Sequence, residues 1–93
     1  MSTITKEKVS TELEEKLGMP YILILHNDDY NSFDWVIECL IKVCGHDPLQ
    51  AEQCAHLVHF TGKCDVKRGD KETITKMYNK LKGANLTVSM EMA

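Results

Sequence analysis

The sequence has no long hydrophobic run and no dense block of basic residues. Its longest uninterrupted apolar run is Tyr21–Leu25, whereas a membrane-spanning helix needs about 20 apolar residues. The N-terminal segment mixes acids and bases and lacks the apolar centre of a signal peptide, so we expect a cytoplasmic protein with no membrane partner. The net charge is -3, and because phosphate binding needs a basic field, nucleic acid is excluded as the leading partner.

The four cysteines do not follow the dense pattern of a secreted disulfide scaffold. We expect reduced and mostly buried thiols. The segment "CAHLVHFTGKC" holds two Cys and two His, which are ligand types that zinc prefers, but no CxxC or HxxxH pair places two ligands on one helix face. The spacing therefore does not favour zinc, and we expect no metal and no other cofactor.

The motifs that usually carry catalysis are also missing. There is no GxSxG, no phosphate-cradling glycine loop and no HExxH. Cys54 and His59 are a nucleophile and a base, but at i and i+5 they would lie about 140° apart on a helix. We therefore expect a protein that is not an enzyme.

Residues 1–18 carry charge without a sustained apolar period and end at Gly18, which is typical of a flexible extension. Residues 19–93 are long enough for one small core. The continuously apolar run Tyr21–Leu25 predicts a central strand, and it stops at Asn27.

Helix signals follow at three places. Ser32 is a candidate N-cap for a helix that Gly45 ends; Asp47-Pro48 begins a second helix that runs to about Phe60 and is closed by Gly62. Ile74, Met77, Tyr78 and Leu81 fall at helical spacing and predict a third helix that Gly83 ends.

Two further strands complete the expected fold. Lys63–Lys67 is a strand candidate, Arg68-Gly69-Asp70 is expected to form a turn that delivers an N-cap, and the alternation over Leu86–Met90 predicts a half-buried strand. The order is β-α-α-β-α-β. We expect an α+β fold, a small two-layer α/β sandwich with three helices packed on one face of a three-stranded sheet.

The polar cluster Asn27-Asp28-Asp29 stands between the first strand and the first helix. Such residues cap helices and tolerate unusual dihedrals, so they can serve a turn alone. However, Asn31 and Ser32 already supply capping candidates, and two adjacent carboxylates repel each other unless a cation is near.

His59 offers a second polar group. It shares a helical strip with Ala55 and Val58, at i, i+3 and i+4. A histidine there can be an ordinary, partly buried residue. If the strip faces the Asn-Asp-Asp loop, a small apolar pocket with a polar mouth results. That pocket suits an unacetylated peptide N-terminus, which is mostly charged at neutral pH and offers three donors.

These residues resemble the ClpS adaptors of Clp proteases. "YILILHNDDYNSFDWVIECL" is similar to that family's strand, Asn-Asp-Asp-Tyr loop and first helix, and "AEQCAHLVHFTGK" is similar to its second helix. The resemblance implies the β-α-α-β-α-β core behind an N-terminal extension. It also implies an adaptor that recognises substrates beginning with Phe, Tyr, Trp or Leu and delivers them to a Clp-family AAA+ unfoldase, through the N-terminal domain of a ClpA- or ClpC-like protein.

The resemblance also implies roles for individual residues. Asn27 and His59 would bind the α-amino group, with Asp28 contributing charge and Asp29 shaping the loop. The pocket for the first side chain would be lined by Leu25, Asn31, Phe33, Val36, Ala55, Val58 and Leu86.

Two departures from the family pattern affect the expected pocket. Phe33 should narrow the entrance and Ala55 should deepen the wall, which favours large aromatic first residues. The stretch "GKCDVKRGDKETITKMY" is shorter than in the family and lacks an acidic, Ala-rich start to the third helix, a surface associated with chaperone docking. The alternative is therefore a protein-interaction module of the same fold that does not read N-termini. In either case we expect a monomer.

Overall fold

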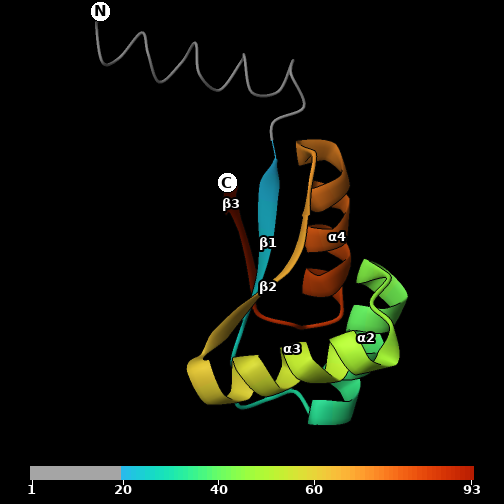
Figure 1. The fold of residues 1–93 in the computed structure, drawn as a ribbon, viewed down its shortest axis with the longest axis vertical. Helices are drawn as coiled ribbons and strands as arrows, with labels where there is room; N and C mark the ends of the chain where they lie inside the picture. Colours follow the sequence, from blue (N-terminus) through green and yellow to red (C-terminus); the bar gives the residue numbers. More distant parts are fainter. Residues whose placement is uncertain (1–19) are drawn as a thin grey trace, which may run out of the picture.

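The computed structural model describes residues 20–93, in which three helices and a three-stranded antiparallel sheet alternate in the predicted order (Figure 1). The elements are β1 (Tyr21–His26), α2 (Phe33–Cys44), α3 (Pro48–Thr61), β2 (Lys63–Gly69), α4 (Lys71–Gly83) and β3 (Val88–Met92). The predicted α+β fold is confirmed. The extension predicted for residues 1–18 lies outside the described residues.

Strand β1 is the centre of the sheet, as its unbroken apolar sequence predicted. The strand order is β2-β1-β3, and both neighbours pair with β1 in antiparallel register. Leu23 and Leu25 of β1 are almost completely buried. The side chains of this central strand therefore form part of the apolar core against which the helices pack.

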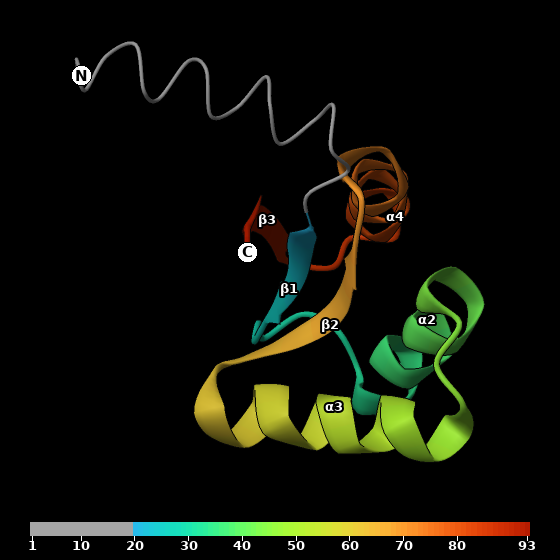
Figure 2. The same ribbon diagram turned by 45° about the horizontal axis from the view of Figure 1, so that its top comes forward.

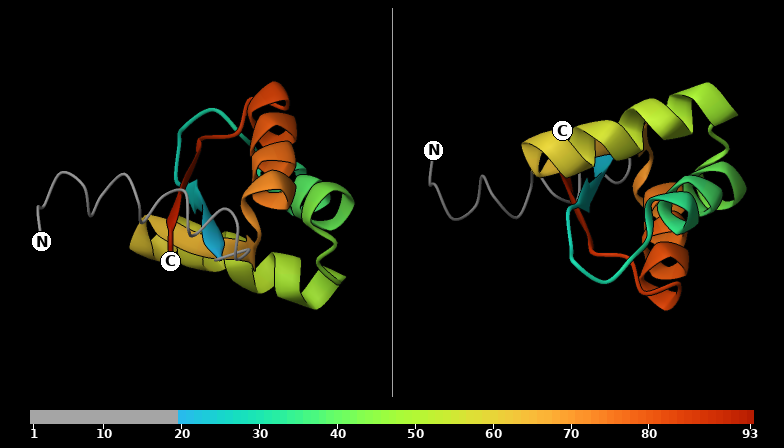
Figure 3. Two further views of the ribbon diagram at one scale, coloured as in Figure 1. Left: turned by 90° about the horizontal axis from the view of Figure 1, so that it is seen from above. Right: turned by 90° about the horizontal axis from the view of Figure 1, so that it is seen from below.

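The helices occupy two different positions around the sheet. In Figures 1 and 2, α4 runs alongside the strands, whereas α3 crosses the end of the sheet where β1 leads into its loop. Figure 3 shows α2 and α4 on the same side of β1 and β3. Their buried side chains meet in one core that includes Leu40 of α2, Cys54 of α3 and Ile74 of α4.

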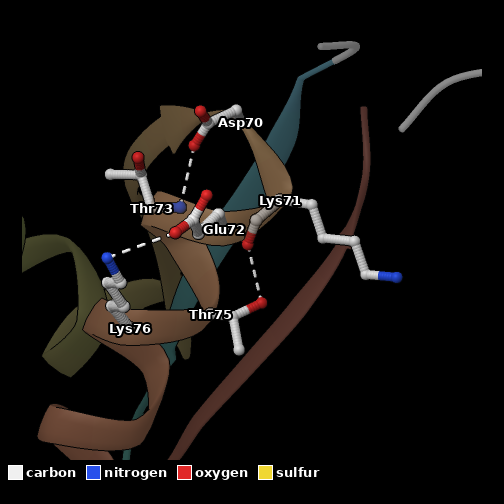
Figure 4. A network of polar contacts seen from close by, with 6 residues as sticks. All are labelled: Asp70, Lys71, Glu72, Thr73, Thr75 and Lys76. Carbon is white, nitrogen blue, oxygen red and sulfur yellow. Dashed lines mark hydrogen bonds and ion pairs between the residues drawn. The ribbon is translucent and has the colours of Figure 1, made fainter. Parts of the chain in front are cut away.

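All three helices begin at the predicted N-caps. The side chains of Ser32, Asp47 and Asp70 accept hydrogen bonds from the backbone N–H three residues on, at 3.1, 2.8 and 2.8 Å. Figure 4 shows the Asp70 cap, together with a Glu72–Lys76 ion pair of 3.4 Å on the same helix. These caps satisfy backbone donors that a helix start leaves unpaired.

The ends of two strands differ from the prediction. β2 continues to Gly69 because Arg68 and Gly69 pair with Ile22 and Tyr21, so the predicted turn is shorter than expected. β3 begins at Val88 rather than Leu86. The reason lies at the end of α4, where Asn85 has φ 69° and the Leu86 N–H donates to the Leu81 carbonyl at 3.0 Å.

Over residues 20–93, no helix combines the length and the apolar character that crossing a bilayer would require.

Candidate functional site

A cavity of about 290 Å³ lies between the β1–α2 loop and helix α3. This volume is at the small end of the range of about 300–1,000 Å³ that is common for ligand pockets. The cavity is lined by Leu25, His26, Asn27, Asp28, Asp29, Asn31, Phe33, Val36, Ala55, Val58 and His59.

The inner wall of the cavity is apolar. Leu25 comes from the central strand, and Ala55 and Val58 lie one turn apart on α3; all three are at most 5% exposed. Val36, one turn into α2, is half-buried and closes the side. The small Ala55 side chain leaves room where a longer one would fill the space.

The loop at the cavity's edge is organised by Asp28. Its Oδ1 accepts from the backbone N–H groups of Tyr30 and Asn31, both at 2.9 Å. Its Oδ2 accepts from the Asn31 amide at 2.9 Å and from the Thr87 hydroxyl at 3.1 Å. One carboxylate thus fixes the loop's turn and ties it to the segment before β3.

These hydrogen bonds set the protonation of Asp28. Burial of the carboxyl acts to raise its pKa, but the donors from Asn31, Tyr30 and Thr87 together outweigh burial and lower the pKa below its ordinary value. Asp28 is therefore ionised at neutral pH. Asp29 makes no hydrogen bond among the described residues, and it is exposed at the cavity.

A backbone hydrogen bond brings the side chains of Asn27 and His59 to the mouth of the cavity. The Asn27 N–H donates to the Gly62 carbonyl at 2.9 Å, which joins the loop to the end of α3, where His59 lies. Neither the side-chain amide of Asn27 nor the imidazole of His59 hydrogen-bonds to another group of residues 20–93. Both can therefore pair with a ligand.

Aromatic rings line the outer edge of this mouth. Phe33 is 38% exposed and meets the His56 ring edge-on at a centroid distance of 4.8 Å. The His59 ring contacts Phe60 at 5.0 Å, also edge-on. The Phe33–His56 contact joins α2 to α3, and both Phe33 and His59 line the cavity.

The structure brings together every predicted site residue except Leu86. Leu86 is buried in the core and does not line the cavity, because the turn at Asn85 directs it toward the end of α4. His26 lines the cavity and was missed. It hydrogen-bonds through Nε2 to the Ser89 hydroxyl at 2.7 Å, and the only signal for it was its position directly after Leu25.

The arrangement offers chemistry for holding a small cationic and apolar group. A negative and amide-bearing rim adjoins the apolar wall of the same cavity. Within the described part of the chain, no group of three or more His, Cys, Asp or Glu side chains is placed to hold a metal ion.

Comparisons with known proteins agree with this geometry. Residues 16–89 match the family model for the ATP-dependent Clp protease adaptor protein ClpS. The ATP-dependent Clp protease adapter protein ClpS of Nostoc sp. is 33% identical over 88 residues, which are 94% of this chain and 90% of that protein. The protein of the same name from Desulforapulum autotrophicum is 37% identical, but the match spans only 58% of its length and 62% of this chain.

A solved structure has the same fold. It is Agrobacterium tumefaciens ClpS2 bound to L-phenylalaninamide, with a TM-score of 0.71 and 20% sequence identity over 82% of this chain and 99% of that one.

Proposed function

This chain belongs to the ClpS family of ATP-dependent Clp protease adaptor proteins, and we propose that it binds the free N-termini of substrate proteins and delivers them to a Clp ATPase. The observation that carries the proposal is the cavity between the β1–α2 loop and α3, with its apolar wall and polar mouth. The first side chain of the substrate enters the cavity, and the α-amino group stays at the mouth.

The polar residues at the mouth have different roles in binding the α-amino group. The ammonium donates to the Asn27 side-chain oxygen and to a ring nitrogen of His59, neither of which hydrogen-bonds to another group of residues 20–93. Asp29 supplies an exposed negative charge close by. Asp28 acts mainly through the loop, because four hydrogen bonds already occupy its carboxylate.

The apolar wall selects the first side chain. Phe, Tyr, Trp or Leu fits a space bounded by Leu25, Ala55 and Val58. The phenylalaninamide bound by Agrobacterium ClpS2 carries a free amino group and an aromatic side chain, which supports this assignment. Burying a Leu or Phe side chain contributes about 1.5–3 kcal/mol, and each charge-assisted hydrogen bond about as much. After the cost of association, the affinity is about micromolar.

The test is a fluorescent peptide that begins with Phe, compared with the same peptide acetylated at its N-terminus. We expect micromolar binding of the first and loss of binding of the second. Asn27→Ala and His59→Ala should each weaken binding at least tenfold, whereas Asn79→Ala, an exposed change on α4, should leave it unchanged. Equal affinity for both peptides would reject N-terminus recognition.

Delivery is tested separately. The substrate-loaded chain should pull down the N-terminal domain of a ClpA- or ClpC-like ATPase and accelerate degradation of a Phe-initiated substrate. If pull-down succeeds but Asn27→Ala and His59→Ala have no effect on degradation, the chain is an interaction module that does not read N-termini.

A further inference from the structure

Two cysteines lie in contact between α3 and β2, and neither lines the cavity. Cys54 on α3 and Cys64 on β2 have their sulfur atoms 2.9 Å apart. Cys54 is 4% exposed, whereas Cys64 is partly open to solvent. Both are free thiols. A disulfide has an S–S length of about 2.05 Å, so a movement of about 0.9 Å joins the two sulfurs.

We propose that Cys54 and Cys64 form a redox modification site, at which a peroxide converts the thiol pair into a reversible intramolecular disulfide. The other two cysteines, Cys39 and Cys44, lie buried in the core, and among the described residues the sulfur–sulfur hydrogen bond is the one between Cys54 and Cys64. The proposal does not depend on N-terminus binding.

The chemistry begins at the sulfur that solvent reaches. The Cys64 thiol first releases its proton, and the thiolate attacks one oxygen of hydrogen peroxide. The O–O bond breaks, and the hydroxide that leaves takes up the released proton, so the products are a sulfenic acid at Cys64 and one water. The Cys54 sulfur then attacks the sulfenic sulfur, the S–O bond breaks, and the hydroxyl leaves as a second water with the Cys54 proton. The two thiols lose two electrons in total, and these reduce the peroxide.

The different settings of the two thiols favour this order. Two causes raise the pKa of the Cys54 thiol well above its ordinary value. Burial is the larger cause, and the hydrogen bond with Cys64 is the next. Cys54 therefore stays protonated and protected from solvent oxidants until the neighbouring sulfur is activated. Its position is that of a resolving cysteine.

A Cys54–Cys64 disulfide would restrict a segment that contributes to the cavity. It closes the chain from Cys54 to Cys64, which includes His59 and the Gly62 carbonyl that accepts the Asn27 N–H. Cys64 is also paired with Leu25 across the sheet. A disulfide that closes a loop of this length restricts the unfolded chain, so the melting temperature of the oxidised protein should rise by roughly 10–20 °C.

The experiment treats the reduced full chain with hydrogen peroxide and measures intact mass, peptide linkage and melting temperature without reductant. We expect a monomer that has lost two hydrogen atoms, a 54–64 linkage in the proteolytic map, and full reversal by dithiothreitol. Cys39→Ala should oxidise in the same way. Cys64→Ser and Cys54→Ala should each fail to lose the two hydrogens and should show no rise in melting temperature.

Other products would overturn the proposal. These are disulfide-linked dimers, sulfinic acid at Cys64 as the main product, or a linkage through Cys39 or Cys44. Circular dichroism of each variant separates loss of the bridge from loss of the fold. A Phe-initiated peptide measured alongside keeps this result distinct from the proposed function, because the disulfide can form whether or not the peptide binds.

Discussion

Asp28 and Asp29 are adjacent in sequence but differ in what surrounds them. The Asp28 carboxylate accepts from two backbone N–H groups, the Asn31 amide and the Thr87 hydroxyl. Asp29 is exposed at the cavity. The family resemblance implied that Asp29 shapes the loop, whereas the hydrogen bonds that hold its turn belong to Asp28. We therefore separate an organising carboxylate from a carboxylate that supplies free charge.

Matched substitutions of Asp28 and Asp29 distinguish the roles of the two carboxylates. Asp28→Asn replaces an acceptor oxygen by an NH₂ group that faces other donors, so we expect the free energy of unfolding to fall by roughly 1–2 kcal/mol and peptide affinity to fall with it. Asp29→Asn should change unfolding by less than about 0.5 kcal/mol while weakening binding modestly. Urea denaturation and peptide titration measure both quantities. Equal loss of stability in the two variants would contradict the assignment of different roles to Asp28 and Asp29.

The second prediction concerns the depth of the pocket. Ala55→Met places a long side chain in the cavity, so affinity for a Trp-initiated peptide should fall about tenfold or more, and affinity for a Leu-initiated peptide should fall less. Leu57→Met, an exposed change on the same helix, is the control and should alter neither affinity. An unchanged preference in Ala55→Met would show that Ala55 does not bound the first side chain.

At the scale of helices and strands, the sequence predicted what is determined locally. Ser32, Asp47 and Asp70 were recognisable as N-caps because a cap depends on the residues of its own first turn. The start of β3 was not recognisable, because Leu86 alternates correctly with Val88, but a hydrogen bond to the end of α4 takes it out of the strand. The cavity membership of His26 likewise depends on how β1 meets the loop.

The third prediction tests the end of α3, which positions the mouth of the cavity. Gly62 ends this helix with φ 96°, a conformation that L side chains rarely adopt. Gly62→Ala should therefore destabilise the fold by about 1 kcal/mol and weaken peptide binding, since Gly62 also accepts the Asn27 N–H.

Gly83 provides the matched control for this change. It is the last residue of α4, does not have a positive φ, and has open space where a Cβ would lie. Gly83→Ala should be neutral or should stabilise by about 0.5–1 kcal/mol, by restricting the unfolded chain. Chemical denaturation of the two variants side by side gives the comparison. A similar effect in both would mean that the backbone conformation at Gly62 is not what matters.

At the scale of the whole molecule, one core joins the sheet to all three helices, and cysteine thiols are part of it. Burial in that core raises the pKa of the Cys44 thiol to about 11, and it also raises the pKa of Cys54 and Cys39. These thiols stay neutral in the folded chain at a pH where exposed thiols ionise. The stability of the domain is therefore linked to alkaline pH through groups that lie outside the proposed binding site.

The fourth prediction follows from that linkage. In the unfolded chain a thiol releases its proton near its ordinary pKa of about 8.5–9, whereas folded Cys44 keeps its proton until about pH 11. Between these values the unfolded state binds fewer protons, so the free energy of unfolding falls as pH rises, by about 2 kcal/mol for Cys44. Urea denaturation of the reduced protein from pH 8 to 11 measures the slope. Cys44→Ala should make it shallower, because it removes one of the titrating groups, and an unchanged slope in that variant would show that the buried thiol does not link folding to pH.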